Sequence, residues 1–217
     1  MYLYGAGGHA KVVIDVLLSQ NIQVAGLFED TGTKDSLNGI PVLPGIKLTG
    51  KPLPELDAPI IVCIGSNPDR AALVYLISNN FGTAIHSSAI VSSSASIGEG
   101  SVVLQGAIIQ AETIIGKHVI INTDASIDHE SIIEDFVHIS PNATLCGQVY
   151  VGEGAHIGAG ATIIPGIKIG KWSTVGAGAV VIRDIPDFAL AVGNPARILA
   201  PRPPEEGGVN ALKLEDI

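Results

Sequence analysis

The sequence predicts a small Rossmann-like α/β domain followed by a parallel β-helix of hexapeptide repeats. Every sixth residue from Val91 through Val181 is Val, Ile or Leu, without an interruption. A period of six belongs to no helix and is a signature of the parallel β-helix. Ahead of this stretch, a short apolar segment leads into a glycine-rich turn and an apolar helical pattern, which is the arrangement of a nucleotide-binding βα unit.

Each hexad is expected to supply one short strand and one corner, with its branched residue pointing into a prism. Three hexads close a triangular coil, so residues eighteen apart should stack about 4.8 Å apart, the usual spacing of paired strands. The residue directly after the inward one is expected to take a left-handed backbone, because residue types that tolerate positive φ recur there. Examples are Gly98, Gly116, Asn122, Asp128, Gly152, Gly158, Gly170 and Gly176.

The region before the repeat has the pattern of alternating strands and helices. Strands are expected over residues 2–4, 24–28 and 59–64, and helices over residues 11–19 and 70–79. The turn at residues 5–10 matches GxGxxA, and an acidic pair ends the second strand about 20 residues later, as in dinucleotide-binding units. The turn and the following helix N-terminus suit a phosphate. We expect a nucleotide-linked sugar here; NAD binding and a purely structural turn are the alternatives.

These patterns divide the chain into four parts: residues 1–84 form the α/β domain, 85–182 the β-helix and 183–199 a cap, and the tail 200–217 is expected to be disordered. The net charge of −9 and the lack of a basic cluster argue against nucleic-acid binding. No apolar run approaches the roughly 18 residues of a membrane span, and the N-terminus does not resemble a secretory signal. A cytoplasmic protein with free thiols at Cys63 and Cys146 is expected.

His129 is the strongest candidate for a catalytic side chain. It follows the inward Ile127 by two residues, so it should point outward at a corner. Its neighbours Asp128 and Glu130 can fix its imidazole and raise its basicity. Gly147 lies eighteen residues further on, one coil above, where it leaves space for the ring and offers a backbone N–H. These residues indicate a general base beside an available backbone N–H donor.

The remaining chemically active residues carry weaker signals. His138 and His156 are eighteen apart and should stack on one outer face, where Thr174 would be a poor third ligand, so no metal is expected. Cys146 adjoins Gly147 but lacks an activating partner, which disfavours an acyl-cysteine. Asn122 directly follows the inward Ile121, so it can be present only for its backbone as a corner residue.

Several segments resemble the NeuD/PglD-type bacterial sugar acyltransferases, and the resemblance spans about residues 1–199. That resemblance implies a left-handed β-helix, a homotrimer and transfer of acetyl from acetyl-CoA. It implies as acceptor a nucleotide-linked amino sugar of the 4-amino-4,6-dideoxy type, for surface polysaccharide or glycan synthesis. The segments that carry it are residues 4–10, 64–67, 122–130, His138 and 192–197.

The resemblance also implies roles for individual residues. His129 would be the general base, Glu130 would orient it, and the Gly147 N–H would bind the thioester carbonyl. His138 would lie near acetyl-CoA, and His156 at a subunit interface. The acetyl-CoA groove between two β-helices would be lined by Gly158, Gly160, Gly176 and Gly178. Substrate contacts would come from Gly7, Gly8, His9, Asp30, Gly65, Ser66, Asn67 and Asn122.

Three other functions agree with parts of the pattern. O-acetylation of a sialic acid would use the same histidine. A non-catalytic or metal-binding β-helix, such as a relative of the γ-carbonic anhydrases, would need three zinc-binding histidines across an interface. An NAD-binding regulator would use only the glycine-rich turn. No residue pattern selects among UDP, GDP and dTDP as the nucleotide.

Overall fold

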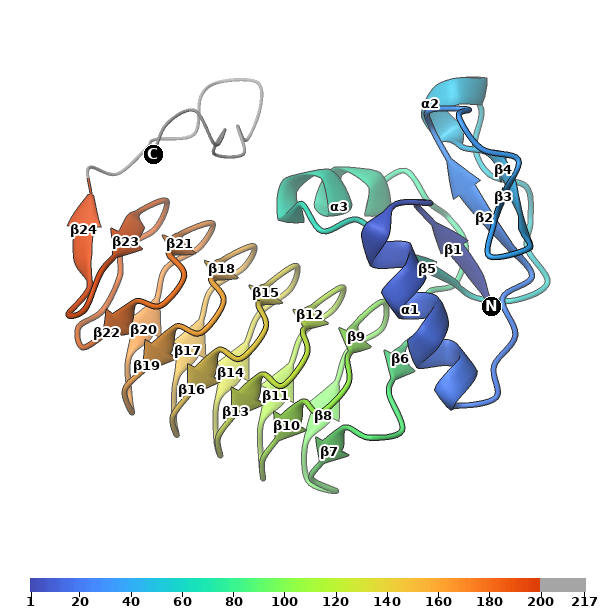
Figure 1. The fold of residues 1–217 in the computed structure, drawn as a ribbon. Coiled ribbons are helices and arrows are strands. Elements are labelled where there is room, and N and C mark those ends of the chain that lie inside the picture. Colours follow the sequence, from blue (N-terminus) through green and yellow to red (C-terminus); the bar gives the residue numbers. More distant parts are fainter. Residues whose placement is uncertain (200–217) are drawn as a thin grey trace.

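The computed structural model describes residues 1–199 and shows an α/β domain packed on the first coils of a β-helix (Figure 1). The α/β domain holds a five-stranded sheet of order β3-β4-β2-β1-β5, parallel except for the β3–β4 pair. Its elements are β1 (Tyr2–Tyr4), α1 (Gly8–Ser19), β2 (Gly26–Glu29), β3 (Ser36–Leu37), β4 (Ile40–Pro44), α2 (Ile46–Thr49), β5 (Ile60–Val62) and α3 (Asn67–Val74).

Two helices of this domain begin earlier than the sequence predicts. Helix α1 starts at Gly8, inside the expected turn, and α3 starts at Asn67 rather than Arg70. The start of α3 follows from its cap, because the Ser66 hydroxyl accepts the Asp69 N–H at 3.4 Å and a proline lies in the first turn. The expected helix end at residue 79 is wrong, since α3 ends at Val74.

The β3–β4 hairpin and α2 were not predicted. The hairpin has a recognisable signal, because Asn38 and Gly39 form its turn and both have positive φ, 51° and 77°. An Asn-Gly pair of this kind is the preferred two-residue hairpin turn. The sheet therefore has five strands instead of the three that the apolar runs indicated.

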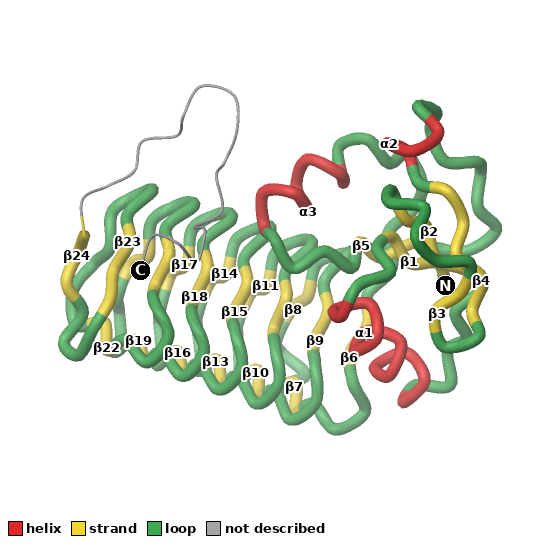
Figure 2. Tube along the Cα trace, turned by 45° about the horizontal axis from the view of Figure 1, so that its top comes forward, coloured by secondary structure: helices red, strands yellow, loops and turns green. Residues whose placement is uncertain are grey.

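The β-helix has three faces, which we name after their first strands (Figure 2). The β6 face contains β6 (Ala84–Ile85), β9 (Val102–Val103), β12 (Ile120–Ile121), β15 (His138–Ile139), β18 (His156–Ile157), β21 (Thr174–Val175), β23 (Leu190–Val192) and β24 (Arg197–Leu199). The β7 face contains β7 (Ile90–Val91), β10 (Ile108–Ile109), β13 (Ser126–Ile127), β16 (Thr144–Leu145), β19 (Thr162–Ile163) and β22 (Val180–Val181). The β8 face contains β8 (Ser96–Ile97), β11 (Ile114–Ile115), β14 (Ile132–Ile133), β17 (Tyr150–Val151) and β20 (Lys168–Ile169).

The predicted eighteen-residue register is confirmed. Ile127 pairs in parallel with Ile109 on one side and with Leu145 on the other. The repeat begins one hexad earlier than predicted, since Ile85 pairs with Val103 and packs against the same core. The inward branched residues form one continuous apolar core along the prism.

The expected position of the left-handed corner residue is wrong. Positive φ occurs at the third residue after the inward one, for example 56° at Glu130 and 61° at Gln148, and not at the first. Glycine recurs at the first position for a different reason. A Cβ built on Gly98 or Gly158 would lie 2.6 or 2.5 Å from backbone atoms of the next coil, so close approach of the coils excludes a side chain.

Each end of the β-helix is covered. At the N-terminal end, α1 covers part of the β6 face. There Ala84, Val102 and Ile120 point outward and are buried in one cluster with Val13 and Leu17 of α1. At the other end, β23 pairs with β21, and β24 turns back antiparallel to β23, within the predicted cap. The predicted tail 200–217 lies outside the described residues. No helix among residues 1–199 combines the length and apolarity that a membrane crossing needs.

The neighbouring residues Ile133 and Ile132 test the inward assignment directly. Ile133 is 1% exposed in the core, whereas Ile132 is 42% exposed on the β8 face. Ile133→Ala is expected to lower the free energy of unfolding by about 2–5 kcal/mol, because it leaves a cavity. Ile132→Ala should cost about 1 kcal/mol or less. Denaturant unfolding of both variants measures the difference, and equal losses would contradict the assignment.

Candidate active site

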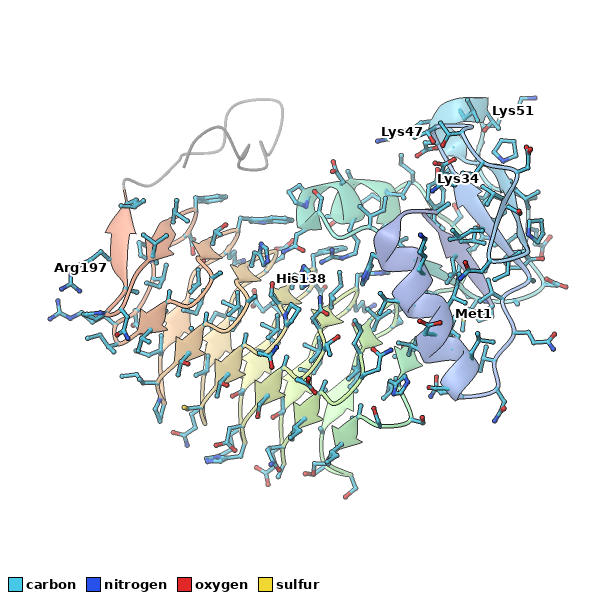
Figure 3. All side chains as sticks on the ribbon, viewed as in Figure 1. Met1, Lys34, Lys47, Lys51, His138 and Arg197 are labelled. Carbon is cyan, nitrogen blue, oxygen red and sulfur yellow. The ribbon has the colours of Figure 1, made fainter. Side chains whose placement is uncertain are left out.

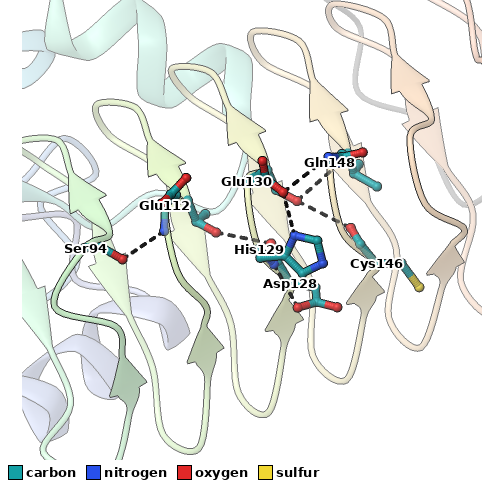
Figure 4. A network of polar contacts seen from close by, with 10 residues as sticks. Ser94, Glu112, Asp128, His129, Glu130, Cys146 and Gln148 are labelled. Carbon is teal, nitrogen blue, oxygen red and sulfur yellow. Dashed lines mark hydrogen bonds and ion pairs between the residues drawn. The ribbon is translucent and has the colours of Figure 1, made fainter.

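His129 lies in the corner between the β7 and β8 faces, with its polar partners on the same and the next coil (Figure 4). Its Nδ1 is 2.9 Å from Oε2 of Glu130, which also accepts the Gln148 Nε2–H at 3.2 Å. The Asp128 carboxylate accepts the His129 backbone N–H at 2.8 Å. With Nδ1 bonded to a carboxylate, the tautomer with a free Nε2 lone pair is favoured. Both His129 and Glu130 are about half exposed, so this lone pair is accessible.

Gly147 packs directly against the imidazole from the coil above. A Cβ at Gly147 would lie 2.7 Å from Cε1 and Nε2 of His129, so any other residue would displace the ring. The Gly147 N–H has no hydrogen-bond acceptor within residues 1–199. A basic nitrogen and an unused N–H donor therefore lie side by side.

Cys146 shares this corner, and its backbone carbonyl accepts the Ser131 hydroxyl at 3.4 Å. Its thiol is unpaired with other cysteines and partly exposed, and Figure 4 shows the sulfur pointing away from the imidazole. Cys63 is buried, and burial raises the pKa of its thiol far above its ordinary value. Neither thiol has the environment of an activated nucleophile.

His138 and His156 stack as predicted on the β6 face, on the same side of the β-helix as α3 (Figure 3). Their ring centroids are 4.9 Å apart with an interplanar angle of 12°. Nε2 of His138 is 3.0 Å from the amide nitrogen of Asn122, and Nε2 of His156 is 2.8 Å from the Ser140 hydroxyl. Burial, reinforced by His156, lowers the pKa of His138 to about 2, so this ring is neutral near pH 7. Within residues 1–199 no three His, Cys, Asp or Glu side chains are grouped to hold a metal ion.

The glycine-rich turn of the α/β domain faces open space. Among residues 1–199, a Cβ on Gly7 or Gly8 would meet no atom within 4 Å, and no side chain caps α1. Nε2 of His9 is buried without a partner within the described residues, and burial lowers the pKa of this histidine to about 4. The Lys34 ammonium donates to the Ala6 carbonyl at 2.6 Å. Free helix N–H groups beside an ammonium suit a phosphate.

Lys34 was not predicted from the sequence. It lies far from the glycine-rich turn along the chain and bonds to a backbone carbonyl, so no residue pattern marks it. Asp30, by contrast, was predicted as a substrate contact. Its carboxylate already accepts the Tyr4 hydroxyl at 2.7 Å and the Lys47 N–H at 2.9 Å, which joins β1, β2 and α2.

The loop after β5 holds the other predicted substrate residues. Gly65 has open space around it, and the Ser66 side chain caps α3. The Asn67 side chain is only 6% exposed, because its amide nitrogen donates to the Gly154 and Ala155 carbonyls and its oxygen accepts from Arg70. The Asn67 side chain thus contacts the β-helix, and the substrate contact expected at this residue remains a prediction.

One chain does not bring all predicted residues together. His129, Glu130 and Gly147 occupy the corner between the β7 and β8 faces. This corner is opposite the β6 face, which carries His138 and the α/β domain. The corner between the β6 and β7 faces holds the remaining predicted residues: Asn122, Gly158, Gly160, Gly176 and Gly178.

The β8 face has a hollow of about 380 Å³ that none of the predicted catalytic or substrate-binding residues lines. Ile114 and Ile132 form its apolar side, and Asp135, Glu153 and Lys171 form its charged rim. The mixed charges at the rim select no ligand class. The His129 corner combines an imidazole nitrogen with a backbone N–H donor, and these are the groups that a general-base acyl transfer needs.

The chain is similar to known acetyltransferases. Residues 1–76 match the PglD N-terminal domain family, and residues 130–164 and 148–183 match the bacterial transferase hexapeptide family. UDP-N-acetylbacillosamine N-acetyltransferase of Bacillus subtilis is 44% identical over 116 residues, which is 47% of this chain and 50% of that protein. An uncharacterised protein of Acanthamoeba polyphaga mimivirus is 33% identical over 104 residues, or 48% of this chain and 21% of that protein. The chain thus spans half or less of these curated relatives.

Solved structures cover far more of the chain. A His→Asn variant of perosamine N-acetyltransferase from Caulobacter crescentus, in complex with CoA and GDP-perosamine, has a TM-score of 0.82 and 38% identity over 92% of this chain and 96% of that one. The acetyltransferase domain of PglB from Neisseria gonorrhoeae, in complex with acetyl coenzyme A, has a TM-score of 0.83 and 38% identity over 91% and 98%. The chain therefore belongs to the hexapeptide-repeat acetyltransferases that carry a PglD N-terminal domain.

His118 forms part of the contact between the two domains. Its ring lies edge-on to Phe81, with centroids 4.5 Å apart, and stacks on Phe136 at 5.4 Å. The side chain is buried, and its Nδ1 has no partner within the described residues. Burial, aided by the nearby Arg70 charge, lowers the pKa of His118 from its ordinary 6.5 to about 4.

This pKa shift predicts a pH-dependent stability. Because the folded pKa is the lower one, the unfolded chain binds more protons between pH 6.5 and 4, so stability falls as the pH drops through this window. His118→Phe removes this contribution, and Phe136 shows that the equivalent position one coil above accepts phenylalanine. Denaturant midpoints at pH 7 and pH 4.5 should differ less in the variant than in the wild type. If the midpoints differ equally in the variant and the wild type, the lowered pKa of His118 is contradicted.

Proposed function

We propose that the protein transfers the acetyl group of acetyl-CoA to the amine of a nucleotide-linked amino sugar of the 4-amino-4,6-dideoxy type. The observation that carries this proposal is the His129–Glu130 pair beside the unused Gly147 N–H. The solved relatives that contain CoA, acetyl coenzyme A or GDP-perosamine support the choice of donor and acceptor class. We place the reaction in the cytoplasm, in the synthesis of a surface polysaccharide or glycan.

The proposed chemistry is a direct transfer. His129 Nε2 removes a proton from the sugar nitrogen as that nitrogen attacks the thioester carbon. The Gly147 N–H donates to the resulting oxyanion, a contribution of about 3 kcal/mol for such donors. The C–S bond then breaks, and the CoA thiolate takes the proton from the imidazolium. Glu130 holds the tautomer and stabilises the transient positive charge on the ring.

The nucleotide-sugar is proposed to bind at the carboxyl ends of the α/β-domain strands. Its diphosphate would lie on the N-terminus of α1 at Gly7 and Gly8, with Lys34 supplying a positive charge and His9 bordering the site. The loop at Gly65 and Ser66 would bound the same site. Asn122 and His138 would contact the sugar or the thioester from the β6 face.

The acceptor bound to one chain would react at the His129 of another. The α/β domain covers the β6 face, and the His129 corner of the same chain is on the opposite side of the prism. Packing the His129 corner of one copy against the β6 face of the next brings both parts together. In a ring of three copies, the His129 corner of each copy packs against the β6 face of the next, so we propose a homotrimer. The acetyl-CoA groove between copies would include Gly158, Gly160, Gly176 and Gly178.

The base assignment predicts a large loss of turnover in His129→Ala. Removal of a general base typically lowers kcat by about 10²–10⁴-fold. Release of CoA thiol from acetyl-CoA in the presence of UDP-, GDP- and dTDP-linked amino sugars measures the rate. Acetyl-CoA binding should stay near the wild-type level, because the variant leaves the proposed CoA groove intact.

His86→Ala is the matched control. His86 lies at a corner of the first coil, where Ser88 is the hydrogen-bond partner of its ring within the described residues, and the variant is expected to keep the wild-type kcat. Near-normal turnover in His129→Ala would remove the base from the mechanism. Transfer to hydroxyl but not amine acceptors by the wild type would point to O-acetylation instead.

If each active site is shared between two copies, the His129→Ala and His138→Ala variants should each be inactive alone and regain activity when they are combined. Coexpression of His129→Ala with His138→Ala gives mixed trimers, each with one site that has the His129 of one copy and the His138 of its neighbour. With random assembly, about a quarter of wild-type activity should return. Activity no higher than that of the separate variants would place both histidines of each site on one chain.

A further inference from the structure

Arg70 is the most deeply buried charged residue in the described part of the chain, with 1% of its surface exposed. Its Nε donates to the His118 carbonyl at 2.9 Å, and one terminal nitrogen donates to the Phe136 carbonyl at 2.7 Å and to the Asn67 side-chain oxygen at 2.8 Å. The other terminal nitrogen donates to the Ile64 carbonyl at 2.9 Å and to that of Gly65 at 3.3 Å. Each guanidinium nitrogen is therefore bonded.

The partners on the β-helix form a regular series. His118, Phe136 and Gly154 are eighteen apart and occupy the left-handed position of one corner, with φ of 54°, 59° and 66°. Arg70 binds the first two carbonyls, and Asn67, which Arg70 holds by its oxygen, binds the third. Two side chains of the α/β domain thus form hydrogen bonds to three successive coils.

The partners on the α/β domain are the carbonyls of the loop that follows β5. This loop contributes Gly65 to the proposed nucleotide-sugar site, and β15 with His138 begins two residues after Phe136. Arg70 therefore joins the substrate loop to the coil that carries His138. A single hydrogen-bonded side chain thus links the Ile64–Gly65 loop to the coil that carries His138.

The charge of Arg70 is balanced by dipoles alone. Within residues 1–199 no carboxylate forms an ion pair with it, and burial lowers the pKa of the guanidinium to about 9. Burying a charge is costly, and an apolar contact would hold two domains together as well or better. The planar guanidinium additionally fixes the orientation of its partners, because its N–H groups bind carbonyls in one geometry.

We propose that Arg70 is a positioning residue of the nucleotide-sugar site, which fixes the Ile64–Gly65 loop against the His138 coil. The inference rests on the proposed function. Acetyl-CoA is proposed to bind mainly in the groove at Gly158, Gly160, Gly176 and Gly178, with only its thioester end near His138, so the affinity for CoA should respond less to a change at Arg70 than the affinity for the nucleotide.

The test is Arg70→Lys, which keeps the positive charge but cannot bridge both sets of carbonyls. Binding of UDP, GDP, dTDP and CoA to the wild type is measured first by calorimetry, which identifies the nucleotide. In the variant the dissociation constant for that nucleotide should rise at least about tenfold, since small misplacements of binding groups have effects of this size. The constant for CoA should stay within about twofold. Arg183→Lys, at an exposed arginine near the cap, is the matched control and should change neither constant.

Unchanged nucleotide affinity in Arg70→Lys would overturn the proposal. Equal weakening of nucleotide and CoA would also overturn it, because that pattern indicates a role in overall stability only. A wild type that binds CoA but none of the three nucleotides would contradict the proposed acceptor class instead. If Arg70→Lys does not fold, Asn67→Asp replaces it. This variant keeps the Arg70 contact but loses the donors to Gly154 and Ala155, and it should weaken nucleotide binding without affecting CoA.

Discussion

The eighteen-residue register is the constraint on which the rest of this structure depends. Most strands of the β-helix have only two residues, and a strand that short has no stability of its own. Each is held by parallel pairing with the coils before and after it, as Ile127 is by Ile109 and Leu145. The inward aliphatic residues then form a single core, and every outward position repeats at strand spacing. A functional side chain therefore has neighbours that are fixed by sequence distance alone.

The same register shapes the polar chemistry. It places Gly147 against the His129 ring, where a larger residue would not fit, and it stacks His156 on His138. It also aligns the carbonyls of one corner in a row, which the α/β domain binds through Arg70 and Asn67. A repeating backbone thus presents both side chains and backbone acceptors at regular spacing, and the two domains are joined through the acceptors.

The repeat made the β-helix, its inward residues and the stacked pairs predictable from the sequence. The left-handed position was not, because glycine serves two needs that look alike in a sequence. At Gly98 it allows close approach of two coils, and at Gly160 it allows a positive φ of 65°. Lys34 and Arg70 were missed for another reason. Their partners are backbone carbonyls, which exist at every residue and leave no trace in the pattern of side chains.

The distribution of the candidate residues argues for a shared site. A triangular prism separates each corner from the opposite face by the full width of its core, and that core is closed by aliphatic side chains. No motion of one chain short of unfolding would bring His129 to the face that carries the α/β domain. Since the proposed base and oxyanion donor are on one side and the proposed nucleotide-binding turn is on the other, a single copy would carry half of each of two sites. Under the proposed mechanism, assembly of several copies is a condition of the chemistry, and the rigid core that prevents closure within a chain would make the geometry between chains reproducible.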